Sequence, residues 1–164
     1  MWKPGFPFAE SHLGRLHGYH RSLCVWSVVH RGTRRRPGLV FGLDAGGSCV
    51  GVAFRVRAAL AERTVEYLAA RELVTSIYHT RLHRIYIPGG AIDAVTFVVD
   101  RSHWQYAGRL SAGEAAKTIA TARGRSGANR DYFANTLTHL HEFGIHDPHL
   151  TQIDQALRMR SRRP

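Results

Sequence analysis

Stretches rich in valine, isoleucine, phenylalanine and tyrosine, separated by glycine and proline, dominate the first hundred residues. Such stretches predict β-strands, because β-branched and aromatic side chains pack well on a pleated sheet, while glycine and proline interrupt it. Glycine pairs between these stretches predict tight hairpin connections at residues 44–48 and at Gly89-Gly90. The predicted strands are residues 23–30, 38–44, 48–57, 74–87 (two strands or one bent strand) and 92–100.

One helix is predicted inside this strand-rich region, at residues 59–73. Four of its residues recur at spacings of four, three and four, which places them on one helical face: Ala61, Val65, Leu68 and Glu72. The spacing therefore puts the Glu72 carboxylate on the side of the helix that is expected to be apolar.

An inward-facing acid such as Glu72 suggests proton-transfer chemistry. Leaving a buried charge unpaired costs several kcal/mol, so burial of an acid normally raises its pKa and prepares it to exchange a proton. The alternative is a structural acid at the end of the helix, paired at the rim of the core with Arg71, Arg55 or Arg57.

After residue 110 the pattern becomes helical. Ser111 and Glu114 form a predicted capping box at the start of a helix, and Gly124 is expected to stop it. A second helix is predicted from Asn129 to Phe143, with an apolar face of Phe133, Leu137 and Leu140. Asp147-Pro148 predicts the start of a third, with Leu150, Ile153 and Leu157 as its buried stripe.

Strands followed by segregated helices predict an α+β fold. The expected architecture is an antiparallel, barrel-like sheet flanked by helices. A doubly wound parallel sheet would need regular alternation of strands and helices, and the sequence lacks it. The 164 residues, 44% of them hydrophobic, are enough for one domain, predicted at residues 1–156 and followed by a basic tail at residues 157–164.

The formal charge of +11 raises the question of an anionic partner. It comes almost entirely from arginine, concentrated at residues 34–36 and near the C-terminus at Arg158, Arg160, Arg162 and Arg163. No nucleic-acid-binding motif accompanies these arginines, so a solvated loop and tail are favoured over nonspecific nucleic-acid contact. No apolar run reaches the length of a membrane span and no signal peptide is evident, which predicts a soluble, cytoplasmic protein without membrane contact.

Cofactor sites are not indicated. Cys24 and Cys49 each lie in an apolar stretch without a second cysteine at metal-ligand spacing, so buried thiols are expected. His139 and His141 are two residues apart, which on a helix points them to different sides, so we expect no metal site. The glycine clusters match neither the Walker nor the dinucleotide fingerprint, and no nucleotide cofactor is implied.

Several segments, taken in order, resemble the ChaC-type gamma-glutamylcyclotransferases. The resemblance extends over nearly the whole chain, to about residue 155. It is carried by Gly18-Tyr19-His20-Arg21, His30-Arg31-Gly32-Thr33, residues 36–44, residues 46–55, Tyr67-Leu68-Ala69-Ala70-Arg71-Glu72, residues 98–103, Gln105-Tyr106-Ala107-Gly108 and residues 124–132.

This resemblance implies cleavage of glutathione into 5-oxoproline and cysteinylglycine without metal or cofactor. The glutamate of the family's Arg-Glu motif is its acid-base group, and Glu72 occupies that position here. Arg31 is the substrate-binding candidate, because a guanidinium can bind a carboxylate with two hydrogen bonds and the family places this loop near its pocket. An arginine that only ties down the loop is the alternative. Tyr132 is a lesser candidate, since a tyrosine early in a helix is usually a core residue with a satisfied hydroxyl.

The chain departs from the family at its start. Family members open with a strand that ends in Tyr-Gly-Ser-Leu, followed by a segment that resembles Met1–Phe6. Two explanations are open: the true product is longer and active, which we favour, or the chain begins at Met1, lacks one strand and is a noncatalytic relative. A smaller departure lies at residues 78–84, where the family more often carries proline and tryptophan. Oligomeric state is not predicted by any of these patterns.

Overall fold

The chain divides into two compact units in the computed structural model, which describes residues 4–73 and 75–161. The first unit comprises the residues up to Ser22 together with Gly42–His103, and the second comprises Leu23–Phe41 together with the residues from Trp104 onward. Strands β1 (Glu10–Ser27) and β2 (Gly38–Arg55) each contribute residues to both units. The domain boundaries expected from the sequence stay a prediction.

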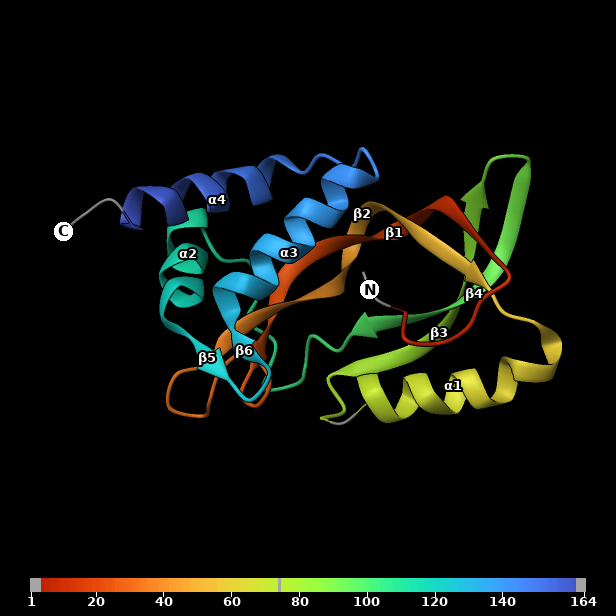
Figure 1. The fold of residues 1–164 in the computed structure, drawn as a ribbon, viewed down its shortest axis with the longest axis horizontal. Coiled ribbons are helices and arrows are strands. Elements are labelled where there is room, and N and C mark those ends of the chain that lie inside the picture. The colour runs from red at the N-terminus through yellow and green to blue at the C-terminus, as the bar shows by residue number, and fades with distance from the viewer. Residues whose placement is uncertain (1–3, 74, 162–164) are drawn as a thin grey trace. The chain divides into compact units, whose positions relative to one another are not determined.

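The first unit is built on a barrel. Its four strands close in the order β1-β2-β4-β3, with β3 at Tyr78–Ile87 and β4 at Gly90–Val99. β3 and β4 form a regular antiparallel hairpin, visible in Figure 1, and the predicted turn at Gly89 is confirmed. Helix α1 (Ala58–Glu72) lies within one residue of its predicted bounds. The expected α+β fold with a barrel-like sheet is confirmed, although β2 pairs with β4 in parallel through Leu43 and Val98.

The hairpin predicted at residues 44–48 is wrong, because β2 continues through it as one strand. Gly46 and Gly47 have φ angles of 100° and 72°, which only glycine adopts without strain. They bend the strand without reversing it, as at a bulge. The carbonyl of Gly46 lies 2.9 Å from Nδ1 of His20 on β1, so the bend stays attached to the neighbouring strand.

The sequence also missed the first half of β1, which begins at Glu10. Leu13 and Leu16 are the only large aliphatic side chains among histidine, arginine and glycine there, so the local pattern is weak. Pairing with β3 gives the segment its structure, since Leu16 lies opposite Ile85 and both are buried. The predicted strand at 74–87 is a single strand that starts at Tyr78, and Val74 lies outside the described residues.

The second unit contains the main hydrophobic core. Helices α2 (Ala112–Thr121), α3 (Asn129–Glu142) and α4 (Pro148–Ser161) gather there with the short strands β5 (Arg123–Gly124) and β6 (Gly127–Ala128). The core includes the predicted Phe133 and Leu140 of α3 and Leu150, Ile153 and Leu157 of α4, while the predicted Leu137 is partly buried and packs against it. Residues of β1, β2 and α2 complete this core, among them Leu23, Leu39 and Ile119.

Helix ends in this unit follow the predicted caps. The Ser111 and Glu114 capping box is present. The Asp147 carboxylate accepts hydrogen bonds from the backbone of His149 and Leu150 at the start of α4. Gly124, in contrast, lies in β5, because α2 ends before it at Thr121.

Helix α4 extends through Ser161, so residues 157–161 of the expected basic tail are helical, with Leu157 buried and Arg158 paired with Asp154 at 2.7 Å. Arg162 and Arg163 lie outside the described residues. Within the part of the chain that the structure describes, no helix is both long and apolar enough to cross a membrane.

Candidate active site

Glu72 is the last residue of α1 and lies on the side of the helix that is covered. The covered face differs from the predicted one in the first half of the helix, where Thr64 is buried while Val65 is 45% exposed. Thr64 satisfies its hydroxyl by donating to the carbonyl of Leu60 at 2.7 Å, which lets a polar residue occupy this face. Leu68 and Glu72 continue the face at spacings of four.

The Glu72 side chain is only 23% exposed and is paired with a cation. Oε1 of Glu72 lies 3.0 Å from Nε of Arg71. The ion pair with Arg71 that the sequence offered as an alternative is therefore present. The C-terminal end of a helix disfavours a negative charge, whereas the guanidinium favours it. The carboxylate is thus held in one place by its neighbour and is not free in bulk solvent.

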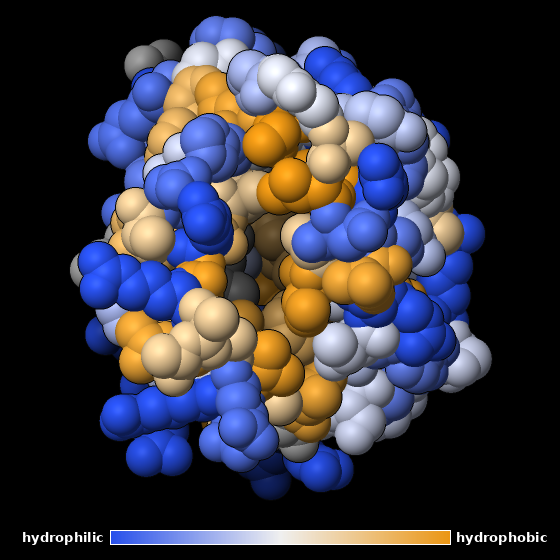
Figure 2. All heavy atoms as spheres, turned by 90° about the vertical axis from the view of Figure 1, so that its right-hand side faces the viewer, coloured by the Kyte–Doolittle hydropathy of each residue, from blue (hydrophilic) through white to orange (hydrophobic). Residues whose placement is uncertain are grey.

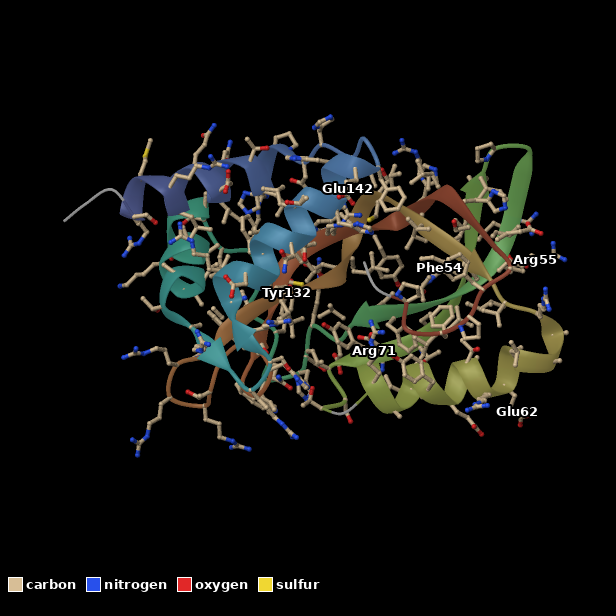
Figure 3. The ribbon with its side chains drawn as sticks, viewed as in Figure 1. Phe54, Arg55, Glu62, Arg71, Tyr132 and Glu142 are labelled. Carbon is tan, nitrogen blue, oxygen red and sulfur yellow. The ribbon has the colours of Figure 1, made fainter. Side chains whose placement is uncertain are left out.

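Arg71 makes further contacts besides its ion pair. Nη1 donates to the carbonyl of Pro4 at 2.9 Å and lies 3.4 Å from the hydroxyl of Tyr67, one helical turn earlier. Its guanidinium lies over the Tyr67 ring, 5.9 Å from the centroid. In Figure 3, Arg71 projects from the side of α1 that faces the strands, while Glu62 projects from the opposite side.

The segment before β1 packs on aromatic residues of the first unit. The rings of Phe6 and Phe8 contact the ring of Phe54 on β2, with centroids 5.9 and 4.9 Å apart. The backbone N–H of Ala9 donates to the carbonyl of Arg55 at 2.8 Å, which fixes the end of the segment. The residues after Pro4 are thereby held in contact with β2 as well as α1.

A hollow with a largely hydrophobic border is visible in Figure 2, which views the molecule from the side of α1 and the β3–β4 hairpin. Exposed apolar side chains are frequent in the first unit, and they include Val65, Tyr67, Leu82 and Val95. Concave sites with mostly apolar walls and a few fixed polar groups are the usual form of small-molecule sites.

Arg31 belongs to the second unit, where it ties two segments together. Its Nη1 donates to the carbonyl of Ser126, and its guanidinium lies 5.2 Å from the centre of the Tyr132 ring. Its backbone N–H donates to Oγ of Ser27 at 3.0 Å. These contacts fit the alternative in which Arg31 anchors its loop. Its role in binding substrate stays a prediction.

Close backbone packing explains the glycines of the same loop. A Cβ on Gly32 or Gly38 would collide with the backbone of the loop itself, and a Cβ on Gly124 would collide with the backbone at Val29 and Gly32. The loop and the β5–β6 turn therefore pack backbone to backbone. Two hydrogen bonds join them, from Arg125 N to Val29 O and from Ser126 N to His30 O.

Tyr132 and Asn129 attach α3 to β2 in the second unit. The hydroxyl of Tyr132 accepts from the backbone N–H of Phe41 at 3.1 Å, which confirms the expectation of a satisfied hydroxyl. Asn129 is fully buried; its side chain accepts from Leu39 N and donates to Leu39 O, both at 2.7 Å. The sequence pointed to Asn129 only as part of a family segment, because a bridge to a residue ninety positions away leaves no local pattern.

The residues predicted as a site thus divide between the units. Glu72 lies in the first unit, and Arg31 and Tyr132 lie in the second. Within the first unit the structure adds Arg71, which sequence reasoning treated only as an ion-pair partner of Glu72. The spacing of Tyr67 and Arg71 on one helical face was the available signal.

The segment around Asp100 has a structural role in the first unit. Oδ1 of Asp100 accepts hydrogen bonds from the hydroxyl and the backbone N–H of Ser102, at 2.6 and 2.8 Å, and these bonds hold the pKa of Asp100 below its ordinary value of 3.8. Next to it, Arg101 pairs with the buried carboxylate of Asp44 at 2.6 Å and donates to the carbonyl of Ala45. The turn after β4 is therefore attached to β2.

A pH-dependent effect on stability follows for Ser102→Ala. Because the lowered pKa of Asp100 reflects interactions of its charged form, their stabilisation is present above the ordinary value of 3.8 and is lost as pH falls through the lower folded value. We expect Ser102→Ala to lower the unfolding temperature at about pH 6, and the difference from wild type to shrink toward about pH 3. The exposed Ser11→Ala is the control, and a difference that grew on acidification would contradict the assignment.

Cys24 and Cys49 are both buried, as expected. Among the residues that the structure describes, no three histidine, cysteine or acidic side chains are grouped so that they could hold a metal ion. His139 and His141 make separate contacts, with Glu142 at 2.8 Å and with the ring of His146.

Comparison with known proteins places this architecture in a family. Residues 1–160 match the family model described as ChaC-like protein. The glutathione-specific gamma-glutamylcyclotransferase of Escherichia coli (strain K12) is 32% identical over 154 residues, which cover 93% of this chain and 67% of that protein. Glutathione-specific gamma-glutamylcyclotransferase 1 of Danio rerio is 34% identical over 169 residues, covering 96% and 84%.

A solved structure has the same fold. The gamma-glutamyl cyclotransferase specific to glutathione from yeast superposes with a TM-score of 0.83 at 19% identity, covering 93% of this chain and 89% of that one. The protein is therefore of the gamma-glutamylcyclotransferase fold. On the strength of the family match over nearly its whole length, the chain belongs to the ChaC-like family.

Proposed function

We propose that this protein is a glutathione-specific gamma-glutamylcyclotransferase, a carbon–nitrogen lyase that converts glutathione into 5-oxoproline and cysteinylglycine. The observation that carries the proposal is the Glu72 carboxylate, mostly shielded from solvent and held by Arg71, in a chain of the ChaC-like family. Relatives from Escherichia coli and Danio rerio bear the name of this activity, which supports the choice of substrate.

The reaction needs one acid-base group and no enzyme nucleophile. The α-amine of the γ-glutamyl unit attacks the carbonyl carbon of its own side-chain amide, so the nucleophile and the electrophile belong to one molecule and a five-membered ring forms. A new C–N bond closes the ring, and the C–N bond to the cysteinyl nitrogen breaks. The protein has to position the chain of the substrate and move protons.

Glu72 would carry those protons. The α-amine is mostly an ammonium at neutral pH and must lose a proton before it attacks, and a carboxylate can accept it. After attack, the ring nitrogen loses a second proton, while the leaving nitrogen must gain protons to depart as an amine. Over the cycle the ammonium of the substrate becomes the ammonium of cysteinylglycine, so Glu72 returns to its starting state.

Incubation with glutathione tests the proposal directly. We expect 5-oxoproline and cysteinylglycine to appear in equal amounts, measured by chromatography with mass detection, without added metal or cofactor. Glutathione that is left intact, or that is consumed without formation of 5-oxoproline, would contradict the proposed function. The cytoplasmic location expected from the sequence stays a prediction.

Arg31 is proposed to bind a carboxylate of glutathione in addition to anchoring its loop. A guanidinium has five N–H donors, and Arg31 uses Nη1 toward Ser126 and the face of the group toward Tyr132, so a carboxylate can approach its other donors. Glutathione has two carboxylates and needs positive charge at its site. A lysine keeps the charge but loses the planar pair of donors.

For Arg31→Lys we therefore expect KM for glutathione to rise about tenfold while kcat changes little. Steady-state kinetics of 5-oxoproline formation measure both constants. Arg125→Lys, at an exposed position of the adjoining β5–β6 turn, serves as the matched control. An unchanged KM in Arg31→Lys, with a lowered unfolding temperature, would assign the residue to loop anchoring alone.

A further inference from the structure

We propose that Arg71 is a positioning residue that couples the seating of the segment Pro4–Phe8 to the orientation of the Glu72 carboxylate. The inference rests on the proposed function, because it assigns Arg71 a role through Glu72. It goes further by making a segment outside the Arg-Glu motif part of the acid-base machinery.

The link to Glu72 is a single charge-assisted contact. Nε of Arg71 meets Oε1 of Glu72 at 3.0 Å. A carboxylate has two oxygens, so a contact through Oε1 fixes the group while Oε2 can exchange a proton with a substrate. Consecutive residues on a helix do not usually face each other, and this pair forms in the last turn of α1.

The link to the segment uses the opposite end of the same guanidinium. Nη1 of Arg71 donates to the carbonyl of Pro4, and Tyr67 supports the group through its ring and its hydroxyl. The next residue, Gly5, has a φ of 75°, and a Cβ at this position would collide with the Tyr67 hydroxyl. Because Gly5 has no side chain, the backbone can lie close to Tyr67, which places the Pro4 carbonyl within hydrogen-bond distance of Arg71.

The guanidinium is planar and rigid, so a change at Nη1 moves Nε as well. Its two links thus form one connection from the Pro4 carbonyl to the Glu72 carboxylate. The segment is itself anchored on Phe54 by Phe6 and Phe8, with Phe54 labelled in Figure 3. Displacing a reacting group by about 1 Å can cost a hundredfold in rate, which makes such a connection consequential for proton transfer.

Arg71→Met tests the role in catalysis, because methionine keeps an unbranched apolar stem without the guanidinium. We expect kcat to fall about tenfold to a hundredfold while KM changes less than about threefold, since the substrate itself is not touched. Arg71→Lys should recover part of kcat through its charge. The matched control is Arg63→Met, an exposed arginine on the same helix, which should retain wild-type kcat. Wild-type kcat in Arg71→Met would overturn the inference.

Gly5→Ala tests the coupling to the segment without altering either charged residue. The added methyl group would collide with the Tyr67 hydroxyl, and alanine is strained at a φ of 75°, so the contacts of Pro4 and Tyr67 with Arg71 should be disturbed and kcat should fall. Because both changes break one connection, the double variant Gly5→Ala/Arg71→Met should be no slower than the slower single variant. Multiplied losses would show that the segment and Arg71 act independently, which would overturn the coupling.

Hydrogen–deuterium exchange gives a readout that does not depend on turnover. We expect Arg71→Met to accelerate exchange in peptides that contain residues 5–10, and Arg63→Met to leave these peptides unchanged. Unchanged exchange in Arg71→Met would overturn the coupling even if the enzyme is active. Wild-type protein without 5-oxoproline release would instead overturn the proposed function, so the two failures are distinguishable.

Discussion

Replacing Glu72 with glutamine is expected to reduce 5-oxoproline release from glutathione to background. Glutamine has nearly the same shape and can still accept a hydrogen bond from Arg71 through its amide oxygen, but it cannot take up a proton from the α-ammonium. General acid-base catalysis contributes about a hundredfold to ten-thousandfold, and here one group would serve both transfers. The release of product, followed over time by mass detection, measures the loss.

The matched control for this variant is Glu62→Gln. Glu62 is an exposed acid on the same helix, and it projects away from the strands in Figure 3, so its loss should leave turnover unchanged. Circular dichroism and the unfolding temperature should show that Glu72→Gln is folded. A folded Glu72→Gln protein that still turned over glutathione near the wild-type rate would remove Glu72 from the mechanism.

Asn129→Ala is expected to destabilise the fold strongly. The side chain is fully buried and satisfies both backbone groups of Leu39 with bonds of 2.7 Å. Alanine leaves a buried N–H and a buried carbonyl without partners, at a cost of roughly 1 to 3 kcal/mol each, so the free energy of unfolding should fall by about 3 kcal/mol. For a chain of this length that corresponds to roughly 6 to 12 °C in unfolding temperature.

Two further variants define the origin of that loss. Asn129→Asp keeps the oxygen that accepts from Leu39 N but places a carboxylate against the Leu39 carbonyl, so it should also be destabilised. Asn135→Ala, at an exposed position on the same helix, should change the free energy of unfolding little. Thermal and denaturant unfolding measure these differences. A stability of Asn129→Ala equal to that of Asn135→Ala would exclude the bridge as a major contributor.

Local patterns predicted the helices well, and the reasons are visible in particular residues. The Ser111 and Glu114 capping box and the Asp147 N-cap act within a single turn, so the sequence contains everything that forms them. The buried residues of α4 are likewise the predicted ones, Leu150, Ile153 and Leu157, because their spacing within one helix places them on one face. On α1 the prediction placed Val65 on the buried face, whereas the fold buries Thr64. Thr64 can be buried because its hydroxyl donates a hydrogen bond to the carbonyl of Leu60 in its own helix, which a pattern of apolar residues does not reveal.

Strands were harder to predict because their partners are distant in sequence. Residues 10–22 have a weak apolar pattern and become a strand through pairing with β3. At Gly46-Gly47 the dipeptide is compatible with either a turn or a bend, and in the fold β2 runs through it as one strand. The candidate site shows the same division, since the sequence identified Glu72 while the contacts of Arg71 with Pro4 and Tyr67 needed the fold.

The sequence by itself determined the helices with their caps, the α+β class, the family resemblance and Glu72 as the acid to test, since each of these depends on spacing within a short segment or on ordered motifs. Only the tertiary structure decided the parallel pairing of β2 with β4, the bridge from Asn129 to Leu39, and the contact of Arg71 with the Pro4 carbonyl. Each of these contacts joins residues that are far apart along the chain. Such a contact forms only when the chain folds, so the spacing of residues within a short segment does not predict it.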